Sequence, residues 1–149
     1  MKIEQVINQT KPFSTAYEKV IVNMVYTNIW LATSQKEFFS KYGLTGKQYN
    51  ILRILRGAGE PISTSTIRSR MLEKMSDSSQ IVDRQEKKEL VTKTFCAHDN
   101  RKVDVSLTKE ATLLLKKIDK TMPKWQGNFS NLTEKEANQL SDLLDKMRK

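Results

Sequence analysis

The sequence predicts a mainly α-helical fold with one small β-hairpin. Apolar residues recur at helical spacing over most of the 149 residues. Glycine and proline are scarce, at five and three residues, which favours long helices and few elaborate loops. Only residues 91–107 change to the alternation of polar and apolar side chains that is typical of half-buried strands.

The first expected helix covers residues 14–42, with Pro12 and Ser14 marking its start and Gly43 its end. Its apolar side chains form a seam resembling a heptad repeat, and others lie outside that seam. A helix that is apolar on more than one side is normally buried on more than one side, and a second subunit is a natural partner in a chain this small. The seam holds Tyr17, Ile21, Met24, Leu31, Phe38 and Tyr42, and the others are Val20, Ile29, Trp30 and Phe39.

Three shorter helices are expected at residues 45–56, 63–71 and 76–88. Glycines at 57 and 59 end the first of them. Each begins at a side chain that can accept a hydrogen bond from its first turn, namely Thr45, Ser63, and either Ser76 or Asp77. Two short helices with a tight connection form a helix-turn-helix, whose second helix fits the major groove of DNA.

The remaining elements are a hairpin and two helices. Strands are expected at residues 91–97 and 102–107, joined by the polar turn 98–101. Thr108 caps a fifth helix, which Pro123 should kink or end. Thr133 and Glu136 form a capping box that opens the last helix.

Composition narrows the classes of partner. The net charge of +9 favours polyanions, with nucleic acid or an anionic membrane as the obvious ones. The basic residues are spread along the chain, so a binding surface has to be assembled by folding. One cysteine fits a reducing compartment, and no apolar run is long enough for a signal peptide or a membrane span. We therefore expect a cytoplasmic protein without a membrane partner.

Polar and cationic side chains mark a DNA-binding surface. Short polar residues open the helix at 76–88, where backbone N–H groups also favour phosphate. An arginine at a hairpin tip suits a narrow minor groove, and Asp99 could orient Arg101 through a charge-assisted bond. The alternative is an ordinary capped surface helix beside a solvated hairpin. The candidate DNA contacts are Thr64, Ser65, Ser76, Ser78, Ser79, Gln80, Arg84, Lys87, Asp99, Arg101 and Lys102.

The stretch LEKMSDSSQIVDRQEKKELVTKTFCAHDNRKVDVSLTKEA resembles the MarR family, regulators named for multiple antibiotic resistance. The upstream LTGKQYNILRIL resembles the helix that precedes it in that family, and the likeness covers about residues 44–111. The matching pieces are Ile81-Val82-Asp83-Arg84, Lys87-Lys88, Leu90-Val91, Asp99-Asn100-Arg101 and Val105-Ser106-Leu107-Thr108.

The resemblance implies a winged helix-turn-helix transcription regulator, a repressor in the usual case, that binds a pseudo-palindromic duplex operator as a homodimer. It places dimerisation helices at 1–43 and 111–149 and the DNA-binding lobe at 44–110. It also implies a cleft between dimer region and lobe for a small phenolic or aromatic-acid effector. The candidate effector contacts are Tyr17, Met24, Asn28 and Tyr49, although such side chains at helical spacing are more often plain core.

Three residues depart from the family pattern. Gln85 stands where leucine is preferred, and Asn100 replaces the first arginine of the wing. Glu89 stands where glycine usually closes the helix in a left-handed conformation. These departures put the packing and exit of this helix, and one DNA contact, in question.

Other classes of function fit less well. Cys96 and His98 share a strand face, but no third group orients them, and one of each is too few for a metal site from a single chain. No phosphate-binding or nucleophile motif is present, so we expect no enzyme and no cofactor. A winged-helix protein-interaction module that has lost DNA binding is the main alternative, and another winged-helix regulator family is a further one. Cys96 is more simply a small strand residue than a redox sensor.

Overall fold

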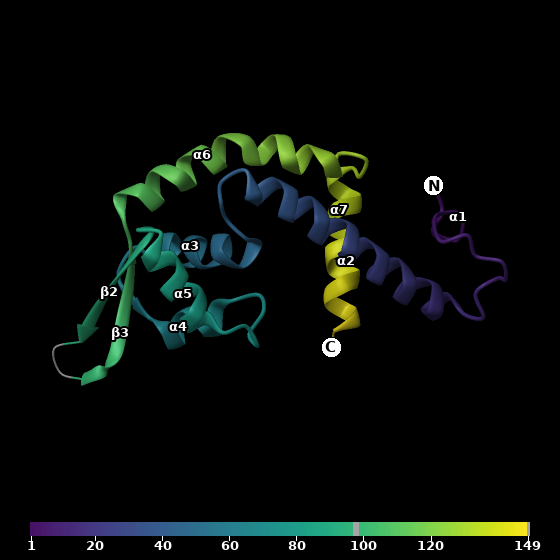
Figure 1. Ribbon diagram of the computed structural model, residues 1–149. Helices are drawn as coiled ribbons and strands as arrows, with labels where there is room; N and C mark the ends of the chain where they lie inside the picture. The colour runs from purple at the N-terminus through teal and green to yellow at the C-terminus, as the bar shows by residue number, and fades with distance from the viewer. Residues whose placement is uncertain (97–98, 149) are drawn as a thin grey trace. The chain divides into compact units, whose positions relative to one another are not determined.

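The computed structural model describes residues 1–96 and 99–148, and the side chains of residues 96 and 99–102 are not part of that description. The predicted turn residue His98 therefore lies outside the described residues. Contacts within the chain group it into two compact units, Met1–Asn50 and Ile51–Lys149. Figure 1 labels helices α1 to α7 and strands β2 and β3.

The first unit consists mainly of one long helix. A single helical turn, α1 (Ile3–Val6), precedes α2 (Ala16–Ser40). The N-cap of α2 is Thr15, whose hydroxyl accepts a hydrogen bond from the Glu18 N–H at 3.1 Å. The predicted start at Ser14 is therefore one residue early, because Ser14 instead donates its own N–H to the Glu18 carboxylate.

Gly43 and aromatic packing fix the C-terminal end of α2. Gly43 takes a φ of +66°, as its predicted role requires, and the next N–H, of Leu44, donates to the Phe39 carbonyl at 3.1 Å. Phe39 is buried and stacks on Tyr49, with 4.3 Å between ring centroids. Nearer the start of α2 the apolar side chains are exposed instead: Tyr17, Val20, Ile21, Val25 and Ile29.

Helix α3 (Gly46–Ala58) begins in the first unit and continues into the second. Thr45 caps it as predicted, since Thr45 and Gln48 exchange side-chain to backbone hydrogen bonds. The helix continues through Gly57, so the predicted end at residue 56 is two residues short. Gly59, with a φ of +70°, is the glycine that takes a left-handed conformation after the helix.

The second unit contains the helix-turn-helix and a small sheet. Its helices are α4 (Thr64–Arg70) and α5 (Ser78–Lys87). Its strands are β1 (Ile62–Ser63), β2 (Val91–Cys96) and β3 (Asp99–Leu107), antiparallel in the order β1-β3-β2. The backbone of β3 begins at Asp99, three residues before the predicted strand, and the register shifts between Phe95, which lies opposite Val103, and Cys96, which lies opposite Asp99.

The core of this unit lies where helices cover the sheet. Val105 of the central strand pairs with Ile62 of β1 on one side and with Lys93 of β2 on the other. Val105 is fully buried, which is the position that the polar–apolar alternation predicts for it. The other apolar side chains with at most 1% of their surface exposed are Ile51, Leu52, Ile67, Val82, Val91, Ala111, Leu115 and Ile118.

The unit ends with α6 (Lys109–Gln126), a short 3-10 turn and α7 (Glu134–Met147). Thr108 and the Thr133–Glu136 box cap the two helices as predicted. Pro123 lies inside α6, which continues to Gln126, so the expectation that proline would end the helix there is wrong. A proline in the last turns of a helix removes one backbone hydrogen bond, and few helical hydrogen bonds follow it. No helix in the part of the chain that the structure describes is long and apolar enough to cross a membrane.

Candidate DNA-binding surface

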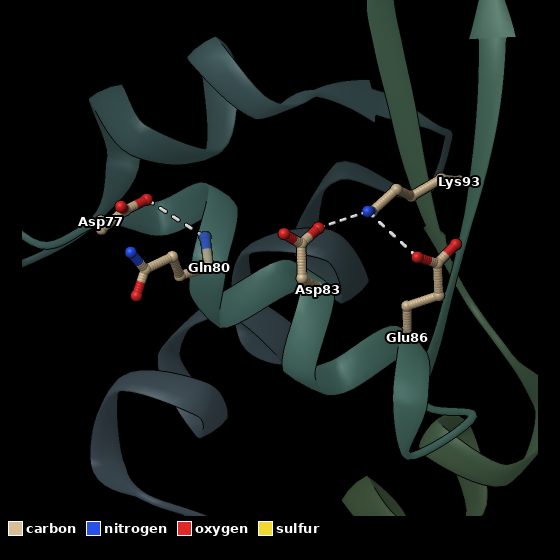
Figure 2. A network of polar contacts seen from close by, with 5 residues as sticks. All are labelled: Asp77, Gln80, Asp83, Glu86 and Lys93. Carbon is tan, nitrogen blue, oxygen red and sulfur yellow. Dashed lines mark hydrogen bonds and ion pairs between the residues drawn. The ribbon is translucent and has the colours of Figure 1, made fainter.

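The start of α5 is capped by Asp77. Its carboxylate accepts a hydrogen bond from the Gln80 N–H at 3.1 Å (Figure 2). A carboxylate at this position satisfies an unpaired amide and complements the positive end of the helix dipole. Of the two residues that the sequence allowed here, the structure selects Asp77, and Ser76 is buried beside it with 8% of its surface exposed.

A polar hollow of about 480 Å³ separates the first turn of α4 from the start of α5. Five of the predicted DNA contacts line it together: Thr64, Ser65, Ser76, Ser78 and Ser79. Arg68, Met75 and Asp77 complete the lining. The sequence prediction missed Arg68, although its spacing of three and four residues from Ser65 and Thr64 places it on their face of the helix.

The predicted contacts differ in how much surface they present. Ser76 and Ser78 have only 8% and 4% of their surface exposed, so their side chains offer little to a ligand. Four others are exposed along α5: Ser79, Gln80, Arg84 and Lys87. Among these exposed predicted contacts, hydrogen-bonding groups therefore lie near the start of α5 and cations towards its end.

An ion-pair cluster joins α5 to the sheet, and the sequence prediction did not include it. The Lys93 ammonium of β2 pairs with the Asp83 carboxylate and, at 3.0 Å, with the Glu86 carboxylate (Figure 2). These two carboxylates, Asp83 foremost, hold the pKa of the Lys93 amine above its ordinary value. The cluster depends on which strand residue lies opposite α5, so local sequence spacing could not reveal it.

The structure describes the hairpin beside α5 mainly through its backbone pairing. Strands β2 and β3 pair from Val91 opposite Leu107 to Phe95 opposite Val103, and the register then shifts so that Cys96 lies opposite Asp99. Thr92 and Ser106 share a cross-strand hydrogen bond of 3.0 Å. The side chains of Asp99, Arg101 and Lys102 lie outside the described part of the chain, so their roles stay predictions.

The candidate effector residues are placed in two groups. Tyr17, Met24 and Asn28 recur at intervals of seven and four residues, which puts them on one face of α2. Tyr49 is buried against Phe39, and Phe39 lies on the order of 30 Å along α2 from Tyr17. Within one subunit, Tyr17 and Tyr49 therefore do not line the same small cleft. The described residues contain no group of three or more His, Cys, Asp or Glu placed to hold a metal ion.

Several solved structures are similar to this chain. A MarR transcription factor from Planctomyces limnophilus matches with a TM-score of 0.71 at 25% identity, over 92% of this chain and 98% of that one. A mutant of MarR from E. coli complexed with operator DNA matches with a TM-score of 0.76 at 22% identity, over 90% and 99%. An organohalide-sensing transcriptional regulator with 2,4-dichlorophenol bound matches with a TM-score of 0.82 at 21% identity, over 94% and 86%. No protein-family model and no curated protein matches the chain.

The chain has a MarR-like winged-helix fold. In this MarR-like fold, α4 and α5 form the helix-turn-helix and the β2–β3 hairpin forms the wing (Figure 1). The expected fold class, helical with a small hairpin wing, is confirmed.

Helix α5 accommodates two of the three sequence departures at its C-terminal end. Gln85 is fully buried, which confirms that this polar residue lies on the inward face. Glu89 takes a φ of +57°, the left-handed conformation that glycine adopts most easily. Its N–H donates to the Glu86 carbonyl at 2.8 Å, and the Leu90 N–H donates to the Gln85 carbonyl at 2.9 Å. This is the Schellman pattern, so α5 ends as a glycine-terminated helix would, with a glutamate in its place.

Proposed function

We propose that this chain is a transcription regulator that binds duplex DNA, with α5 in the major groove and the β2–β3 hairpin beside it. The observation that carries the proposal is the exposed polar face of α5 within a MarR-like fold, formed by Ser79, Gln80, Arg84 and Lys87. The major groove admits one α-helix, and amide and guanidinium groups read base edges there. The structural neighbour from E. coli is itself described in complex with operator DNA, which supports this docking.

We also propose that the functional unit is a homodimer, which would read a pseudo-palindromic operator. Each unit of the chain leaves an apolar helix face exposed. On α2 the exposed side chains are Tyr17, Val20, Ile21, Val25, Ile29 and Trp30, and on α7 they are Leu140, Leu143 and Met147. Exposed apolar patches of this kind mark protein–protein contacts. The helices concerned are those predicted to dimerise, in the segments 1–43 and 111–149.

The direct test is selection of bound sequences from a random duplex pool with the purified protein. Sequence-specific binding should yield two half-sites about 10 base pairs apart, centre to centre. Gln80→Ala should change which bases are preferred, and Arg101→Ala should weaken binding to all sequences. If no sequence is enriched and both variants bind like the parent, the proposed docking is wrong. Light scattering of a folded monomer at micromolar concentration would refute the dimer.

A phenolic or aromatic-acid effector is the second part of the proposal. The organohalide-sensing neighbour is described with 2,4-dichlorophenol bound, and Met24 and Asn28 offer a thioether and an amide side by side on α2. An effector that releases DNA must itself bind more weakly when operator is present, by the same factor. Calorimetric titration of a phenolic-acid panel, with and without operator, measures that factor. Equal affinity in the two conditions would reject the coupling.

One observation favours a second candidate, a protein-interaction module. Leu72 and Met75, in the connection between α4 and α5, have 92% and 90% of their surface exposed. Large apolar side chains there suit a protein partner better than a phosphate backbone. A protein with this second function would show no salt-dependent affinity for any duplex in the selection experiment.

A further inference from the structure

The recognition helix carries no net charge of its own. Residues 77–88 contain three acidic and three basic side chains. Asp83 and Glu86 are three residues apart, so they lie on neighbouring positions of one helix face, where like charges repel. Under the proposed function these two carboxylates would also enter the strongly negative field of a DNA groove. In a helix used for DNA binding, a cation held close to these two carboxylates would offset their local repulsion of phosphate.

Lys93 supplies the offsetting charge from the adjacent strand. Its ammonium lies between the two carboxylates, at 3.0 Å from the Glu86 oxygen and in contact with Asp83 (Figure 2). Its side chain is 22% exposed, compared with 54% for Asp83 and 43% for Glu86. An ammonium group has three donors, and two of them are taken up here. Lys93 is therefore poorly placed to serve as a phosphate contact as well.

We propose that Lys93 is a positioning residue, which fastens α5 to wing strand β2 and masks two α5 carboxylates without touching DNA. The inference rests on the proposed function, because it assigns Lys93 a part in DNA binding. Its backbone supports this role, since Lys93 pairs with Val105 at the centre of the three-stranded sheet. One side chain thus links strand β2 to the second half of the recognition helix.

The test separates masking from contact by salt dependence. Each phosphate contact contributes about −0.9 to the slope of log affinity against log salt for duplex DNA. Lys93→Met should weaken operator binding about fivefold, on the scale of a partly exposed ion pair, and leave that slope unchanged. Lys87→Met, a matched loss of an exposed lysine on α5, should reduce the slope by about 0.9. Lys93→Arg should bind like the parent, because a guanidinium can bridge both carboxylates.

A double-mutant cycle supplies the second readout. In the background Asp83→Asn, Glu86→Gln, the change Lys93→Met should cost no affinity, because no carboxylate remains to be masked. A fivefold loss in that background, or a reduced salt slope in Lys93→Met alone, would show direct contact and overturn the proposal. Unchanged affinity of Lys93→Met in the parent background would also overturn it.

The failure of the proposed function would look different. A parent protein that binds no duplex would refute DNA binding itself, and amide hydrogen exchange of the free protein would then decide the fastening. Lys93→Met should speed exchange in β2 and in the second half of α5, and Lys93→Arg should not. Equal protection in all three proteins would overturn the fastening independently of DNA.

Discussion

The left-handed backbone of Glu89 after α5 predicts a change in stability whose size can be worked out from the structure. Glu89 holds a φ of +57°, and two backbone hydrogen bonds, of 2.8 and 2.9 Å, keep it there. The left-handed conformation costs a side chain with a Cβ roughly 1–2 kcal/mol. Glycine avoids that cost but gives the unfolded chain more freedom, worth about 0.5–1 kcal/mol. Glu89→Gly should therefore stabilise the fold by about 0.5–1 kcal/mol, the difference between the two.

The assay is urea unfolding at fixed protein concentration, because the stability of the proposed dimer would depend on concentration. Glu89→Ala is the matched control, since it removes the same charge and side chain but keeps the Cβ that causes the strain. The glycine variant should have a higher midpoint than both parent and alanine variant. The corresponding rise in melting temperature is about 1–4 °C for a chain of this size. A glycine variant no more stable than the alanine variant would refute the reasoning that links φ to stability here.

Three further predictions concern glycine conformation, a helix cap and a buried side chain. Gly43→Ala should destabilise the fold by about 1 kcal/mol, because Gly43 has a φ of +66°, whereas Gly57→Ala inside α3 should stabilise it by about 0.5–1 kcal/mol in the same denaturant titration. Hydrogen bonds from the Thr133 backbone N–H and hydroxyl lower the pKa of the Glu136 carboxyl below its ordinary value of 4.5. The contribution of Glu136 to the free energy of unfolding should therefore be full above about pH 4.5 and fade as the pH falls. Unfolding measured against pH should show this fading in the parent but not in Glu136→Gln. Ile67→Ala, at a fully buried site of α4, should cost about 2–5 kcal/mol by denaturant unfolding, and a cost below 1 kcal/mol would contradict the assigned core.

Local signals in the sequence accounted for most of the elements. Thr45, Ser63, Thr108 and Thr133 cap helices where predicted, because an N-cap bond involves only neighbouring residues. The alternation in the second strand placed Val105 in the core for the same reason. Of the two effects expected at Pro123, a kink or an end of the helix, the end is wrong, because α6 continues to Gln126.

The features that sequence reasoning missed depend on segments meeting in space. The pairing of Lys93 with Asp83 and Glu86 needs the placement of β2 beside α5, which is set by tertiary packing. The burial of Ser76 and Ser78 likewise depends on how the start of α5 packs within its own unit. The sequence therefore predicted that short polar side chains lie at the start of α5, but not which of them are accessible.

The charge distribution separates attraction from recognition in the proposed DNA complex. The chain carries a net charge of +9, yet residues 77–88 hold equal numbers of acidic and basic side chains. Long-range attraction to a polyanion must then come mainly from elements other than α5. The DNA sequence would be recognised by side chains at the exposed start of α5, such as Gln80, since an amide can form paired hydrogen bonds with adenine. Because the acidic and basic side chains of residues 77–88 balance, α5 by itself neither adds to the positive field nor opposes it, and Lys93 contributes one further positive charge beside it. Substitutions that add positive charge to α5 should consequently raise affinity for all DNA sequences and reduce the ratio of specific to non-specific binding.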